Sequence, residues 1–226
     1  MYTSISPILT EPFSPSELVL LSGEQFATPA RFGNNVQLLH TDAKVSAEDL
    51  GQAMLGAAIL TCEQSGAINL QVRQKKALMG LRKVSAVFAD PANVAVTWPA
   101  HSLEANVLRL AQELQAEEGN DVSNIVYLWL GKDSSVPWRT TVELVQQGLV
   151  ARGHVEEYKK KRLKVFSASE YALPEGTAAL AARQPVAQLQ DMLAACERER
   201  PELWKLLQKQ IKDAVKKRTE DSDTSF

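Results

Sequence analysis

Two short runs of cationic residues are the part of this sequence best suited to binding a ligand. The first run, residues 73–83, carries five cations and no acid in eleven positions, and the second, residues 159–164, carries five cations in six positions. The cations are Arg73, Lys75, Lys76, Arg82 and Lys83 in the first run and Lys159, Lys160, Lys161, Arg162 and Lys164 in the second. Clustered ammonium and guanidinium groups attract phosphate-bearing surfaces, so both runs are candidate anion-binding segments.

Catalytic and metal-binding motifs are missing from the sequence. It contains no GxSxG nucleophile elbow, no HExxH helix and no complete phosphate loop. His101 and Glu104 stand one helical turn apart, but the other carboxylates of a dinuclear metal site are missing, which favours an ordinary helix start. Cys62 and His154 could form a nucleophile and base only if the fold joined them, so a small buried residue is the favoured interpretation of Cys62. We therefore expect no enzymatic activity, no metal and no cofactor.

The composition of the chain limits the partners it can have. Its 226 residues are 45% hydrophobic and 23% charged, and 25 Lys and Arg against 27 Asp and Glu give a net charge of -2. Collagen-like, disulfide-scaffold and wholly disordered chains are excluded, and so is attraction of the whole molecule to polyanions. Two cysteines, no basic leader and no apolar run long enough to span a bilayer predict a cytoplasmic protein that lies at most peripherally on membranes.

Local signals predict one mainly α-helical, compact domain over residues 14–217. A flexible arm over residues 1–13 precedes it, and a disordered acidic tail over residues 218–226 follows it. Ser14, Pro15 and Glu17 begin the first helix, and Ser46 caps the second. Apolar spacing predicts further helices at 103–118, from Pro137 onward, and at 177–182, 185–199 and 201–217. The apolar segment 122–130 fits either a buried helix or a central strand.

A helix followed by a hairpin is expected twice. The helix that Ser46 caps ends at Gly66, and alternating residues on either side of the basic stretch 73–83 predict a hairpin. The helix that begins at Pro137 ends at Gly153, and a second hairpin with a basic tip at 159–162 follows. These two units resemble winged helices. Their helices are poor in Arg and Lys, so we rank membrane headgroups above DNA as the partner of the basic runs.

The order of these segments resembles the Golgi phosphoprotein 3 family. The resemblance covers roughly residues 15–170 and is carried by SELVLLSGE, AMLGAAILTCEQSGAINLQ, RQKKALMGLRKV, HSLEANVLRLAQEL, NIVYLWLG and LVQQGLVARGHVEEYKKKRLKVF. The order and spacing of these motifs along the chain carry the resemblance.

The resemblance implies a non-enzymatic adaptor that binds phosphatidylinositol 4-phosphate at a basic pocket, on the Golgi if the cell is eukaryotic. Among the implied pocket positions Arg139 matches an arginine of the family. Ser46, Leu55 and Val142 stand near or at positions where the family has a tryptophan and two arginines. Three kinds of partner remain open: an anionic phospholipid surface, nucleic acid as the less favoured choice, and a protein partner or second copy bound through a hairpin or the helix at 201–217.

Overall fold

A central helix, α2 (Ala47–Gln64), is buried over most of its surface because its sequence is apolar nearly all round. It packs against α1 (Pro15–Leu21), α3 (Leu103–Gln115), α5 (Pro137–Ala151), α7 (Val186–Glu199) and α8 (Pro201–Asp223). The structure is a computed structural model that describes residues 13–30, 33–41, 43–77, 82–92, 94–162 and 166–223. It is 56% helical, which confirms the predicted mainly α-helical class.

The other elements are two helices, one short turn and three hairpins. The helices are α4 (Val122–Leu130) and α6 (Glu175–Ala181), and the turn is the 3-10 helix η1 (Gly23–Gln25). The strands are β1 (Asn35–Gln37), β2 (Lys44–Ser46), β3 (Ile68–Ala77), β4 (Arg82–Pro91), β5 (Glu156–Arg162) and β6 (Phe166–Ala172). They pair antiparallel as β1–β2, β3–β4 and β5–β6, so each sheet of the described chain has two strands.

Side chains next to the helix ends explain where the helices begin. Ser14 N–H donates to Glu17 Oε2 at 2.8 Å at the start of α1, and Ser46 Oγ accepts from Asp49 N–H at 3.2 Å at the start of α2. The segment 122–130, for which a helix and a strand were both open, is a helix. Asp121 Oδ1 accepts from Asn124 N–H at 3.4 Å at its start, and Gly131 ends it with a φ of 72°.

A helix followed by a hairpin occurs twice, as predicted, while the likeness of these units to winged helices stays a prediction. α2 leads into β3–β4, and α5 leads into β5–β6. Gly66 makes the first turn from helix to strand and Gly153 makes the second, each with a φ of 75°, which side chains other than glycine rarely adopt. The strands are longer than predicted, so the basic residues of the described ranges lie along β3, β4 and β5 rather than in connecting segments. Each further residue of a paired strand adds ladder hydrogen bonds, which favours extending the hairpin.

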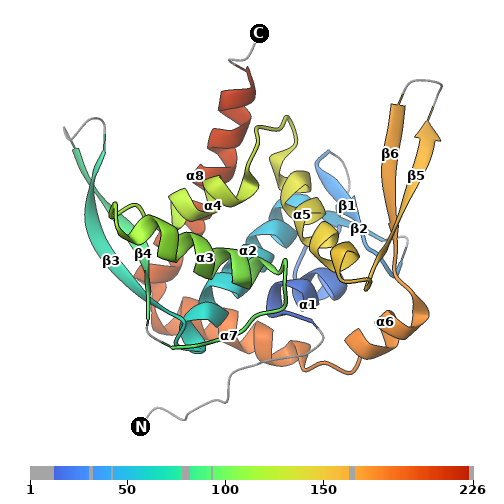
Figure 1. Ribbon diagram of the computed structural model, residues 1–226, viewed down its shortest axis with the longest axis horizontal. Helices are drawn as coiled ribbons and strands as arrows, with labels where there is room; N and C mark the ends of the chain where they lie inside the picture. The colour runs from blue at the N-terminus through green and yellow to red at the C-terminus, as the bar shows by residue number, and fades with distance from the viewer. Residues whose placement is uncertain are drawn as a thin grey trace.

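The two long hairpins lie at opposite ends of the molecule. In Figure 1, β3–β4 stands on the left and β5–β6 on the right, and both rise toward the same edge of the molecule as the C-terminal end of α8. α7 runs along the opposite edge. The two basic runs therefore share an edge of the molecule, but the helical body separates them.

Both ends of the predicted domain need correction. Phe13, which was assigned to the flexible arm, is fully buried, and its ring lies 5.1 Å from that of His154. α8 does not end at residue 217 but continues to Asp223. Arg218, which was assigned to a disordered tail, is 8% exposed because its guanidinium binds the Tyr127 carbonyl and Asp133. The rest of the predicted arm and the last three residues of the tail lie outside the described residues.

The apolar face of α8 is covered inside the protein. Its buried side chains are those of Leu203, Leu207, Ile211, Ala214 and Val215. α8 packs against α4, β4, α7, α2 and α5. This apolar face therefore forms part of the core and is not open to a partner, while partner binding through the rest of α8 stays a prediction.

Replacing Gly148 of α5 by alanine is expected to lower the free energy of unfolding by about 1–3 kcal/mol. A Cβ atom at this position would lie 2.7 Å from the backbone oxygen of His101, so one of the two segments would have to shift. Gly176 of α6 is the matched control, because its Cβ would meet nothing within 4 Å. Gly176→Ala should be neutral or slightly stabilising. Urea denaturation measures both variants, and an equal response of the two would contradict the close approach.

Candidate functional site

Two cations of the first basic run are held by carboxylates of the protein. Arg73 Nη2 lies 2.5 Å from Asp90 Oδ1, and the same guanidinium lies over the Phe88 ring, 4.1 Å from its centroid. Lys75 Nζ lies 2.8 Å from the buried Asp121. These charges are largely compensated, so Arg73 and Lys75 fix the hairpin to the body rather than presenting free charge to a ligand. Lys83 is exposed on β4.

Asp121 joins the β3–β4 hairpin to the helices. Its Oδ1 also accepts from Gln210 Nε2 of α8 at 3.3 Å, and Gln210 Oε1 accepts from the backbone N–H of Val87 at 2.7 Å. Lys75, Asp121 and Gln210 thus form one polar network between β3, α4 and α8. This network explains why Lys75 of the basic run is directed toward the helices rather than toward solvent.

The second basic run lies on β5 and has no acid opposite it in the hairpin. Lys159, Lys160, Lys161 and Arg162 pair in register with Ser169, Ala168, Ser167 and Phe166 of β6. The nearest acidic register position is Glu170, opposite Tyr158. In the first run, Lys76 pairs in register with Lys83, and Arg82 pairs with Ala77. Lys164 lies outside the described residues.

Arg139 lines an open cleft between the β1–β2 hairpin, α5 and β6. The cleft has a volume of about 740 Å³, and its walls also carry Lys44, Val142, Glu143 and Glu170. Arg139 Nη2 makes one long hydrogen bond, 3.4 Å, to the Gly33 carbonyl, and its buried Nε has no hydrogen-bond partner among the described residues. The guanidinium therefore has donors to spare for a ligand.

The positions of the implied family pocket only partly meet at this cleft. Arg139 and Val142 line it, whereas Ser46 and Leu55 are not among its lining residues. The cleft also has carboxylates on its wall, so it is not a purely basic pocket.

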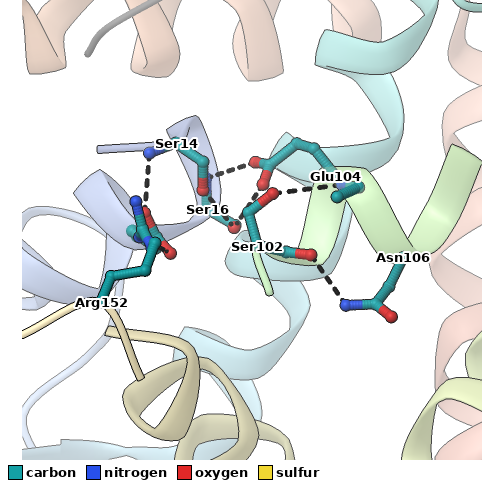
Figure 2. Close-up of polar contacts among 8 residues, drawn as sticks. Ser14, Ser16, Ser102, Glu104, Asn106 and Arg152 are labelled. Atoms are coloured by element: carbon teal, nitrogen blue, oxygen red, sulfur yellow. Dashed lines mark hydrogen bonds and ion pairs between the residues drawn. The ribbon is translucent and has the colours of Figure 1, made fainter. Parts of the chain in front are cut away.

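A buried group of two glutamates joins α1 to the start of α3 and the end of α5, and no sequence motif predicted it. Figure 2 shows Glu104 directed at Ser14 and Ser16, with Arg152 on the other side of the start of α1. Glu104 Oε1 accepts from Ser16 N–H at 2.7 Å, and Oε2 accepts from Ser16 Oγ at 3.0 Å. Glu17 forms an ion pair with Arg152 from the end of α5.

Burial governs the protonation of this group. Complete burial and the nearby Glu17 carboxylate raise the pKa of Glu104 from an ordinary 4.5 to about 7. Burial also raises the pKa of Glu17, against the opposing charge of Arg152. The hydrogen bonds of Glu104 and the ion pair of Glu17 are all made to groups of the protein itself. The two glutamates therefore have a structural role, because they hold α1 against α3 and α5. Glu104 is the member of the group whose pKa lies near neutral pH, and no ligand is needed to satisfy its hydrogen bonds.

The residue pairs considered for catalysis or metal binding have separate roles. Cys62 Sγ lies 3.6 Å from the Glu104 backbone oxygen, and burial raises the pKa of its thiol well above the usual range. His154 instead packs on Phe13. Glu104 binds Ser16. Within the described ranges, no group of three or more His, Cys, Asp and Glu residues could hold a metal ion.

The comparisons with known proteins add no relative. No family model matches the sequence, and neither a curated protein nor a solved structure matches it. The resemblance to the Golgi phosphoprotein 3 family thus stays a prediction from the sequence. In the part of the chain that the structure describes, none of the helices is long and apolar enough to cross a bilayer.

Proposed function

We propose that the protein is a non-enzymatic, adaptor-type peripheral membrane protein that attaches to surfaces rich in anionic phospholipids, phosphoinositides included. The observation that carries the proposal is the run of four consecutive cations on β5, Lys159 to Arg162, paired in register with uncharged residues of β6. Cations near an anionic bilayer each contribute about 1 kcal/mol of attraction. This attraction grows with the charge of the lipid, which favours phosphoinositides among the anionic lipids.

The β3–β4 hairpin has a smaller part in this proposal than the sequence suggested. Arg73 and Lys75 are paired with Asp90 and Asp121, whereas Lys83 is exposed on β4 and is the cation that we assign to membrane contact in this hairpin. Both hairpins rise toward one edge of the molecule, so that edge would face the membrane (Figure 1). We propose β5–β6 as the main contact and β3–β4 as a weaker second contact.

Nucleic-acid binding of the winged-helix type is the less favoured alternative. The two helix–hairpin units give the chain the required order of elements. However, α2 packs against five other helices and is mostly buried, so it cannot enter a DNA groove as a recognition helix. A gel-shift assay with duplex DNA at low salt tests this alternative directly.

Reversing the charge of Lys159, Lys160 and Lys161 to Glu is expected to weaken binding to phosphatidylserine or phosphatidylinositol 4-phosphate vesicles by about tenfold to a hundredfold. Co-sedimentation at low and moderate salt measures the effect, and salt should weaken wild-type binding because surface charges are screened. The charge-matched control reverses Arg183, Arg198 and Lys205, which are exposed cations of the α6 to α8 region. Equal loss in both triple variants, or equal retention on neutral phosphatidylcholine vesicles, would contradict the proposal.

A further inference from the structure

The cleft beside Arg139 carries cations and carboxylates on the same walls. Arg139 and Glu143 stand one helical turn apart on α5, Lys44 lies on β2, and Glu170 lies on β6. Opposite charges at this helical spacing often pair with each other, as Arg109 and Glu113 of α3 do at 2.8 Å. No ion pair joins Arg139 to Glu143 among the described residues, although both side chains line the cleft.

Glu170 and Tyr171 of β6 line the cleft together with Glu143 of α5. Tyr171 is partly buried next to α5, and burial, with the carboxylates of Glu157 and Glu143 nearby, raises its pKa. Glu143 itself is exposed to the cleft. The cleft thus offers guanidinium donors from Arg139 and carboxylate acceptors from Glu143, one helical turn further along α5.

We propose that this cleft binds a zwitterionic phosphodiester of the phosphoethanolamine type, with the phosphate on Arg139 and the primary ammonium on Glu143. A phosphodiester carries one negative charge, which one arginine can compensate, and an ammonium donates to a carboxylate. A ligand with a second phosphate would place additional negative charge beside Glu143, which repels it. A choline group has no N–H to donate. This inference rests on the proposed function in one respect, which is that a membrane supplies the phosphoethanolamine group.

A titration with soluble headgroups tests the cleft without any membrane. The probes are sn-glycero-3-phosphoethanolamine, sn-glycero-3-phosphocholine and inositol 1,4-bisphosphate, and the readout is the backbone amide signals of residues 35–41 and 139–146 in two-dimensional NMR. We expect saturable shifts with the ethanolamine compound at concentrations about tenfold lower than with the choline compound. Equal affinity for the two, stronger binding of the bisphosphate at these residues, or no shift with the ethanolamine compound would overturn the inference.

Two variants separate the roles of the two charges. Arg139→Gln should abolish the shifts with all three probes, because it removes the site for the phosphate. Glu143→Gln should leave binding of the choline compound nearly unchanged and remove the tenfold preference for ethanolamine. Glu113→Gln, an exposed glutamate of α3, is the control and should behave as wild type. Retained ethanolamine preference in Glu143→Gln would overturn the assignment of the ammonium site.

Vesicles then identify the source of the headgroup and keep the two proposals apart. At constant phosphatidylserine, replacing phosphatidylcholine by phosphatidylethanolamine should increase retention of wild type but not of Glu143→Gln. If the soluble compound binds and the lipid does not increase retention, the cleft site stands and a soluble phosphoethanolamine ester is its ligand. Failure of the lysine reversal on β5 would overturn membrane attachment but would leave the headgroup titration unaffected.

Discussion

Above pH 7, replacing Arg152 by methionine is expected to lower the free energy of unfolding by about 3–5 kcal/mol. The side chains of Arg152 and Glu17 are 13% and 1% exposed, and they form an ion pair. Methionine fills a similar volume but leaves the Glu17 carboxylate buried without its partner. Removal of one member of a buried pair costs more than the pair itself contributes, because the remaining charge has lost its compensation.

The destabilisation should shrink as the pH falls. Without Arg152 the pKa of Glu17, which burial already raises, will rise further, so the folded state will hold a proton that the unfolded state releases. Protonation removes the uncompensated charge, and stability recovers at low pH. Urea denaturation at several pH values measures this trend.

Two further variants make this prediction specific. Adding Glu17→Gln to Arg152→Met should restore much of the lost stability above pH 7, since no buried charge remains. Arg109→Met is the control, because Arg109 and Glu113 are 53% and 56% exposed and such surface pairs contribute about 0–1 kcal/mol. If Arg152→Met were no more destabilising than Arg109→Met, the buried ion pair would not stabilise α1.

The helical framework could be predicted because its signals are local. Ser46 binds a backbone group three residues away, Gly66 and Gly153 mark turns by their own conformation, and the apolar spacing of α3 repeats within one helix. The sequence did not decide between a helix and a strand at 122–130, because an apolar run fits a buried helix and a buried strand equally. The capping carboxylate of Asp121 and the terminating Gly131 agree with the helix.

Which basic residues form ion pairs within the protein could not be predicted, because their partners lie far away in the sequence. Arg73 pairs with Asp90, 17 residues on, and Lys75 pairs with Asp121, 46 residues on. A charge count within residues 73–83 therefore overestimates the charge that this hairpin can offer. The run on β5 keeps its predicted role as a proposal because its register partners are uncharged.

The burial of Glu17 and Glu104 could not be predicted from the sequence either, because their partners are also far away in the chain. Glu104 lies in the first turn of α3, where an acidic residue is common at the surface. Its burial follows from the packing of α1, whose Ser16 is 88 residues away, and the Glu17–Arg152 pair spans 135 residues. A local pattern can place Glu104 at a helix start, but only the tertiary fold removes it from water.

Glu104→Gln is expected to stabilise the protein by roughly 3 kcal/mol above pH 7 and to have little effect below pH 4.5. The pKa of Glu104 is about 7 in the folded state and 4.5 when unperturbed, so the folded state binds more protons between these values. The contribution of Glu104 to wild-type stability is therefore fully present below pH 4.5 and is lost as the pH rises through 7. Glutamine stays neutral and avoids this loss.

The hydrogen bonds between Glu104 and Ser16 can be kept when Glu104 is replaced by glutamine. Protonated Glu104 accepts from Ser16 N–H through one oxygen and can donate to Ser16 Oγ through the other. A glutamine amide does the same with its carbonyl and its NH₂ group. Ser16 can then turn its own hydrogen toward Ser14 Oγ, which lies 3.2 Å away. The variant thus resembles the protonated state of the wild type, which is why the two should be equally stable at low pH.

The measurement is the free energy of unfolding of both proteins from pH 4.5 to above pH 7. At high pH the difference corresponds to a midpoint of thermal unfolding about 6–12 °C higher for Glu104→Gln. Glu113→Gln on the same helix is the control, because its carboxylate is 56% exposed, and the difference it makes should change little with pH. A constant difference between Glu104→Gln and wild type across this range would show that Glu104 does not titrate there. Glu17, whose pKa burial also raises, would then be the next carboxylate to test as a source of stability lost with rising pH.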